Sequence, residues 1–127
     1  MTAGASAADA NSHLNVYRGT TFTGYSALYL QFHTGDPGAA GTTAVSTAIT
    51  ARNQITWNAA SGGSMTLSTL ANYTSTGSET LTHWSWWTAS SGGTFVRSGQ
   101  LTTSIPVISG SVISWSSLTV SDAPIAA

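Results

Sequence analysis

The chain has no cysteine and no lysine, and only 6% of its 127 residues are charged. The absence of cysteine excludes disulfides and thiolate metal sites. Ordinary domains carry about 25% charged residues, so this surface must consist mostly of serine, threonine, asparagine, glycine and alanine. Mixed charge normally keeps a monomeric protein soluble. A chain with so little charge is therefore expected to cover much of its surface with partners.

The few charges also limit the class of partner. The formal net charge is −1, and the three arginines, Arg18, Arg52 and Arg97, form no basic stripe. We therefore expect no nucleic-acid partner. No apolar run reaches the roughly 18 residues of a membrane-spanning helix, and residues 1–5 lack the basic and apolar regions of a signal peptide. We expect no membrane partner either.

Side chains suited to catalysis or metal binding are scarce. Asp9 and Asp122 fall in segments expected to be mobile, which leaves Asp36 and Glu79 as the one pair available for acid–base chemistry. His33 and Asp36 lack a third and a fourth metal ligand. Asp36 is expected instead to accept a hydrogen bond from its own backbone two residues on. The sequence thus predicts no catalytic residue, no metal site and no cofactor.

Tryptophan, by contrast, is concentrated in one stretch, Thr80–Thr88, which holds three of the five tryptophans. Alternate side chains of a β-strand point to opposite faces, so Trp84 and Trp86 share one face and Trp87 lies on the other. A large ring on both faces favours a central strand covered on both sides, or a strand covered on one side with its other face in an interface. Trp84 and Trp86, with Tyr73 nearby, have two open interpretations: core or subunit interface, or an exposed platform that stacks on sugar rings.

Short alternating segments separated by turn sequences predict antiparallel strands. The expected strands are 27–33, a segment within 50–58, 65–67, 70–74, 80–88, 94–101, 105–108, 112–115 and 118–121. Trp57–Gly63 and Trp87–Gly93 share the pattern Trp-x-Ala-x-Ser-Gly-Gly, which indicates one strand-to-turn arrangement used twice. The predicted fold is mainly β, an antiparallel β-sandwich of jelly-roll or Greek-key type with a short N-terminal helix.

The N-terminal residues are expected to form a separate arm. Residues 1–17 are predicted as an arm and short helix, 18–122 as the β-sandwich domain and 123–127 as a C-terminal tail. Leu14 and Tyr17 lie at helical spacing on one face, and so short a helix is marginal alone in water. It must pack on this domain or on a neighbour, which makes Leu14 and Tyr17 interface candidates.

Several motifs, in order, resemble a family of small virion proteins of tailed bacteriophages that are called tail fibre, minor tail or minor capsid proteins. In that family an aromatic-Arg-Gly-Thr step precedes a strand ending in Leu-His-Thr-x-Asp-Pro-Gly, and an Ala-Arg-Gln-x-Val-Thr-Trp segment follows. The matching segments here are Tyr17–Phe22, Leu28–Gly38, Ala51–Gly63, Thr82–Trp84 and Ser98–Thr103. The resemblance implies an assembled, non-enzymatic virion protein.

Two functions of different classes follow. The first is a structural accessory protein of a bacteriophage virion, assembled in the host bacterial cytoplasm. It would decorate the capsid or form part of the tail by multimeric packing, with copies of itself and the major capsid or tail proteins as partners. The alternative is a carbohydrate- or receptor-binding module of a fibre or tail tip, with a host glycan as partner. An enzyme such as a glycan depolymerase is the least favoured function, because the sequence has so few carboxylate side chains.

Overall fold

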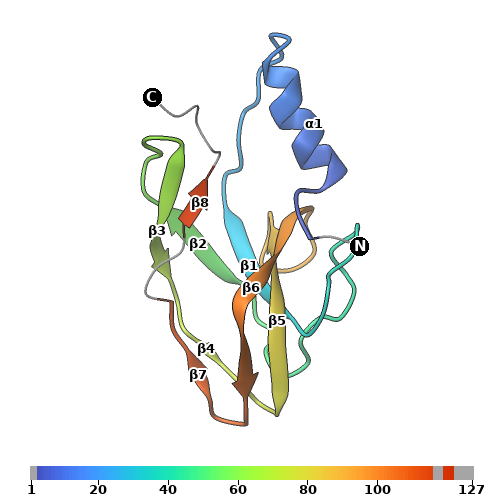
Figure 1. Ribbon diagram of the computed structural model, residues 1–127, viewed down its shortest axis with the longest axis vertical. Helices are drawn as coiled ribbons and strands as arrows, with labels where there is room; N and C mark the ends of the chain where they lie inside the picture. The colour runs from blue at the N-terminus through green and yellow to red at the C-terminus, as the bar shows by residue number, and fades with distance from the viewer. Residues whose placement is uncertain (1–2, 116–118, 122–127) are drawn as a thin grey trace.

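The computed structural model describes residues 3–115 and 119–121 and contains one helix and eight strands within them (Figure 1). The elements are α1 (Ala7–Val16), β1 (Leu28–His33), β2 (Asn53–Trp57), β3 (Ser64–Leu70), β4 (Tyr73–Thr74), β5 (Glu79–Trp87), β6 (Phe95–Val107), β7 (Val112–Ile113) and β8 (Thr119–Ser121). The prediction of a mainly β fold with one short N-terminal helix is confirmed. The predicted tail, 123–127, and Asp122 lie outside the described residues.

All strand pairs are antiparallel, as the sequence predicts. One sheet has the order β6-β5-β1-β2-β3-β8, and a ribbon pairs β4 with β7. Tyr73 and Ile113 face each other in the ribbon and are buried in the same core as Leu30 and Phe32 of β1. The ribbon therefore closes one face of the sheet and makes the fold sandwich-like.

Several expected strands have different bounds in the structure. The segment 70–74 is interrupted, because β3 ends at Leu70 and β4 begins at Tyr73. The segments 94–101 and 105–108 join into the long strand β6. Pro106 lies within β6 at the edge of the sheet, where a residue without a backbone N–H breaks no ladder hydrogen bond. Pro106 is therefore tolerated inside a strand because β6 is an edge strand.

The tryptophan-rich strand β5 is covered on both faces. It lies between β6 and β1, and both Trp86 and Trp87 are buried although they point to opposite faces. Phe95 packs on Trp87 with ring centroids 5.6 Å apart, and the guanidinium of Arg52 lies 4.0 Å from the Trp87 ring centroid. The expectation of a central strand with a large ring on each face is confirmed.

Helix α1 begins and ends with recognisable capping signals. Ser6 precedes it, and the Ser6 hydroxyl accepts the backbone N–H of Asp9 at 3.1 Å, which satisfies one of the free donors of the first turn. At the other end Gly19 has φ of +89°. The N–H of Gly19 bonds the Val16 carbonyl, and that of Thr20 bonds the Asn15 carbonyl, which is the Schellman arrangement. Gly19, with its positive φ, thus marks the end of the helix.

Before α1, the arm pairs with the outer edge of β6. The N–H of Ser6 bonds the Val96 carbonyl at 2.8 Å, and the N–H of Ser98 bonds the Gly4 carbonyl at 2.7 Å. The Ser98 hydroxyl also accepts the N–H of Gly4. The arm thereby occupies edge groups that would otherwise be open to another strand, and it fixes where α1 leaves the sheet.

Candidate functional site

The two tryptophans proposed as a sugar platform contact each other instead of standing free. Trp84 and Trp86 are stacked with centroids 5.1 Å apart, and Trp57 packs on Trp86 at 5.2 Å. Trp86 is 3% exposed and belongs to the core. Trp84 is half-buried and lies so close over Gly99 that a methyl group on that glycine would come within 2.2 Å of a Trp84 ring carbon. The sequence left two interpretations open, core or subunit interface on one side and an exposed sugar platform on the other. For Trp86 the structure supports the core interpretation.

Tyr73 is a core residue as well, which corrects its choice as a glycan-binding candidate. It is 1% exposed, and its ring meets Phe32 edge to face at 4.9 Å. Its hydroxyl donates to the Leu30 carbonyl at 2.6 Å and accepts the N–H of Asn53. Burial raises the pKa of the Tyr73 hydroxyl. A ligand approaching from solvent cannot reach this side chain.

Leu14 and Tyr17, the two helix candidates, point away from this chain's own sheet. Leu14 is 63% exposed and Tyr17 is 90% exposed. The one buried residue of α1 is Asp9. Of the two ways in which the helix was expected to cover its apolar residues, packing of Leu14 and Tyr17 on this domain is therefore wrong, and packing on a neighbour is left.

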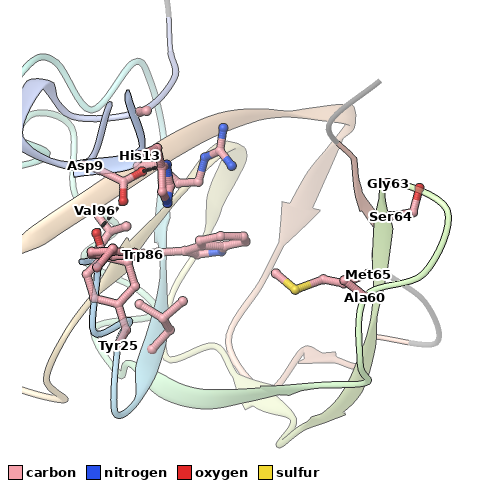
Figure 2. Close-up of a pocket in the computed structure, with 13 residues that line it drawn as sticks. Asp9, His13, Tyr25, Ala60, Gly63, Ser64, Met65, Trp86 and Val96 are labelled. Carbon is pink, nitrogen blue, oxygen red and sulfur yellow. Dashed lines mark hydrogen bonds and ion pairs between the residues drawn. The ribbon is translucent and has the colours of Figure 1, made fainter. Parts of the chain in front are cut away.

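A cavity of about 430 Å³ lies between α1 and the sheet, here called the α1 cavity (Figure 2). Its lining residues are Ala5, Asp9, His13, Phe22, Tyr25, Leu28, Ala60, Gly63, Ser64, Met65, Trp86, Val96 and Arg97. Figure 2 shows Trp86 and Met65 pointing toward each other across it. The volume lies within the range of small-molecule pockets, and a mostly apolar lining with a few polar groups is typical of them.

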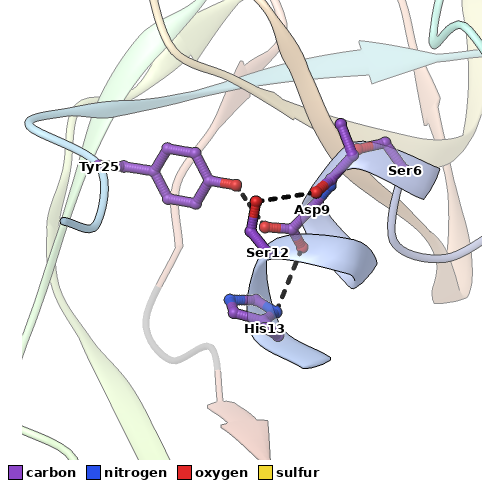
Figure 3. Close-up of polar contacts among 6 residues, drawn as sticks. Ser6, Asp9, Ser12, His13 and Tyr25 are labelled. Carbon is purple, nitrogen blue, oxygen red and sulfur yellow. Dashed lines mark hydrogen bonds and ion pairs between the residues drawn. The ribbon is translucent and has the colours of Figure 1, made fainter. Parts of the chain in front are cut away.

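The polar side of the α1 cavity is organised around the buried carboxylate of Asp9 (Figure 3). The Tyr25 hydroxyl donates to Asp9, and His13 Nδ1 lies 3.7 Å from the other carboxylate oxygen. Burial, the hydrogen bond to Asp9 and the negative charge of Asp9 all raise the pKa of Tyr25. These contacts join α1 to the segment that precedes β1.

Asp9 is the site residue that sequence reasoning missed, because the arm was expected to be mobile. In the structure Asp9 is 3% exposed. A signal was present: Ser6 followed three residues later by Asp9 resembles a capping box, and a serine that caps a helix fixes the chain around it. The partner Tyr25 lies sixteen residues away and has no local signal.

The other two acids among the described residues, Asp36 and Glu79, have structural partners. Asp36 accepts the backbone N–H of Gly38 at 2.8 Å, which is the turn contact predicted from the sequence. Glu79 accepts the Ser46 hydroxyl at 2.6 Å and the Thr47 N–H at 2.9 Å. Desolvation alone would raise the pKa of Glu79, but these hydrogen bonds outweigh it and lower the pKa. Glu79 thereby anchors the loop between β1 and β2.

His33 lies at the centre of a buried hydrogen-bond chain. Its Nδ1 is 2.9 Å from the Thr43 carbonyl, which can only accept, so Nδ1 carries the proton. Nε2 then accepts the Ser85 hydroxyl at 2.7 Å, and the Ser85 oxygen accepts the indole N–H of Trp87 at 2.8 Å. Burial lowers the pKa of His33, and the nearby charges of His83 and Arg52 act in the same direction against the Thr43 contact.

The described part of the chain offers neither a metal site nor a membrane-spanning helix. Within residues 3–115 and 119–121, no group of three or more histidine, aspartate or glutamate side chains is placed to hold a metal ion. No helix among those residues has both the length and the hydropathy needed to cross a bilayer.

These observations define a mainly β domain in which a capped helix covers an apolar cavity. The family model described as podophage GP4 fiber I protein gp80 matches residues 4–121. Since the match spans most of the chain, the protein belongs to this family of bacteriophage fibre proteins. It is thus a phage structural protein, and the resemblance to phage virion proteins is confirmed at that level. No curated protein matches the chain.

Proposed function

We propose that the protein is a building block of a virion fibre and that it acts by packing against copies of itself and against neighbouring tail or capsid proteins. Membership of a fibre family supports the fibre role. The observation that carries the packing role is the exposed end of α1. Leu14, Val16 and Tyr17 are all exposed there, and exposed apolar groups that gather on one surface mark an interaction site.

The low charge of the chain supports the same role. With 6% charged residues, copies of the protein have little electrostatic repulsion to overcome when they meet. The proposal assigns the protein no reaction. A purely structural role is supported by the three carboxylates Asp9, Asp36 and Glu79, which are each engaged in contacts within the fold.

Sedimentation velocity over a wide concentration range tests the packing role. We expect the wild type to associate and the double variant Leu14→Ser, Tyr17→Ser to associate more than about tenfold more weakly, because each apolar side chain buried at an interface contributes about 1.5–3 kcal/mol. Thr103→Ala, an exposed position on β6, is the matched control. A wild type that stays monomeric at every concentration would contradict the proposal.

Electron microscopy of particles that carry the labelled protein would show whether the protein lies on the tail or on the head.

The α1 cavity favours one second function, binding of a host glycan. Arg97, Asp9 and His13 supply polar groups beside the rings of Phe22 and Tyr25, a combination suited to sugars. Titration with a glycan panel should then quench tryptophan emission. The response should be lost in Arg97→Gln and kept in Arg18→Gln, a control outside the cavity lining. An equal response in both variants would remove the cavity from consideration.

A further inference from the structure

The most exposed large apolar side chains among the described residues gather in two places. One is the α1 tip, formed by Leu14, Val16 and Tyr17. The other is the turn tip, formed by Ile108 and Val112, which are 67% and 60% exposed. Figure 1 shows the end of α1 and the turn between β6 and β7 at opposite ends of the long axis of the molecule. One chain therefore cannot cover either tip with the other.

Both tips have a fixed backbone. The Schellman hydrogen bonds hold the α1 tip. At the turn tip, the N–H of Ser111 bonds the Ile108 carbonyl at 3.0 Å, the N–H of Ile108 bonds the Ser111 hydroxyl, and the N–H of Gly110 bonds the Ser75 carbonyl at 2.8 Å. Apolar groups on an ordered backbone lose little conformational entropy when they bind. Each tip is thus preorganised as a contact surface.

The charges next to the two tips are opposite. Arg18 follows the α1 tip directly and is exposed. Glu79 pairs with Val107, the last residue of β6 before the turn tip. In a contact between two α1 tips, the Arg18 side chains of the two copies would approach each other. In a contact between two turn tips, the two Glu79 side chains would approach each other. Contact between unlike tips brings opposite charges together, which favours that orientation over the other two.

We propose that the α1 tip of one copy packs on the turn tip of the next, so that subunits join head to tail along their long axis. This inference rests on the self-association proposed above and names its two surfaces. A contact between two different surfaces is heterologous, and where its rotation does not close a ring it builds an open row. The partner of each tip is therefore a second copy of this chain.

Complementation between two variants tests the inference. One variant loses the α1 tip (Leu14→Ser, Tyr17→Ser), and the other loses the turn tip (Ile108→Ser, Val112→Ser). We expect the wild type to form species larger than dimers, and each variant alone to stay monomeric in sedimentation velocity. An equal mixture of the two variants should form dimers and nothing larger, since each mixed pair keeps one intact contact.

The other outcomes separate the two proposals. If the turn-tip variant still associates alone while the α1-tip variant does not, self-association stands and the head-to-tail contact is wrong. If a wild-type chain at high concentration is monomeric, both proposals fail. If only addition of another virion protein produces a complex at a tip, that protein and not a second copy is the partner, and the inference is overturned.

A second measurement does not depend on loss of association. The chain contains no cysteine, so one copy can carry Tyr17→Cys and another Ile108→Cys without competing thiols. A short bismaleimide should join the two variants when they are mixed and give little product with either alone. Matched far-ultraviolet circular dichroism spectra of all variants confirm folding. Products formed only within one variant would contradict the head-to-tail contact.

Discussion

His33 illustrates why a residue type alone does not reveal its role. A histidine near an aspartate is a reasonable metal or catalytic candidate in a sequence, and Asp36 is only three residues away. In the structure His33 is completely buried, and both ring nitrogens are occupied by Thr43 and Ser85. Period-2 alternation shows which side chains share a face of a strand. It cannot show that a loop closes over that face.

The buried neutral state of His33 predicts acid sensitivity. The unfolded chain binds a proton at this histidine near pH 6.5, whereas the folded protein does so only at lower pH because its pKa is lowered. The unfolded state therefore binds more protons as the pH falls below about 6.5, and the free energy of unfolding decreases. Urea denaturation between about pH 7.5 and 5.5 measures this decrease, in a range that avoids protonation of carboxylates.

Two variants isolate the contribution of His33. The decrease should shrink in His33→Gln and persist in His13→Gln, whose histidine is largely exposed. A decrease of the same size in wild type and His33→Gln would assign it to another group.

Gly99 is required by the ring that lies on it. A methyl group there would meet Trp84 at 2.2 Å, and overpacking of this kind costs about 1–3 kcal/mol. We expect Gly99→Ala to lower the free energy of unfolding by about that amount and to shift tryptophan emission toward longer wavelength as Trp84 is displaced. Gly4→Ala, whose added methyl meets nothing within 4 Å, should leave both unchanged. An unchanged emission spectrum in Gly99→Ala would show that Trp84 does not move.

At the scale of single elements, local signals are reliable where the chemistry itself is local. The repeated Trp-x-Ala-x-Ser-Gly-Gly pattern places each tryptophan at the end of a strand, β2 and β5, and the glycines of both copies have positive φ between +59° and +79°. The end of α1 is likewise predictable from Gly19. The contacts of α1 are not, because its buried side chain is a carboxylate rather than the apolar residues that mark a docked face.

The attachment of α1 depends on the hydrogen bond from Tyr25 to Asp9. Tyr25→Phe removes the donor and leaves a buried carboxylate oxygen without it, a loss that costs about 1–3 kcal/mol. We expect that decrease in the free energy of unfolding and faster amide hydrogen exchange in α1. Tyr17→Phe removes a hydroxyl from an exposed ring and serves as the control. Equal stability of the two variants would mean that α1 is held mainly by its other contacts.

For the whole molecule, the mainly β class and the antiparallel pairing follow from strand spacing, but the sheet order does not. The order β6-β5-β1-β2-β3-β8 brings β1 beside β5, which is about fifty residues later in the chain. Such pairing depends on non-local packing of Leu30 and Phe32 with Tyr73. For the same reason the sequence could name Tyr73 as an aromatic near the tryptophans without showing that it faces inward.

The proposed association through two apolar tips predicts a specific response to salt. A contact dominated by apolar burial should change little between about 0.05 and 0.5 M sodium chloride, although this range shortens the screening length severalfold. Sodium sulfate should strengthen it, because excluded salts favour burial. Light scattering at fixed protein concentration measures both responses. Dissociation in sodium chloride would instead assign the contact mainly to Arg18 and Glu79.

The pairing of residues 4–6 with β6 has a consequence for proteolysis. A protease that removed this arm would uncover the N–H of Ser98 and the carbonyl of Val96, which now bond Gly4 and Ser6. The trimmed edge would be free to recruit strands sideways, at right angles to the proposed end-to-end contacts. A single clip near the N-terminus is therefore expected to add sideways strand pairing to the proposed end-to-end association and to favour precipitation.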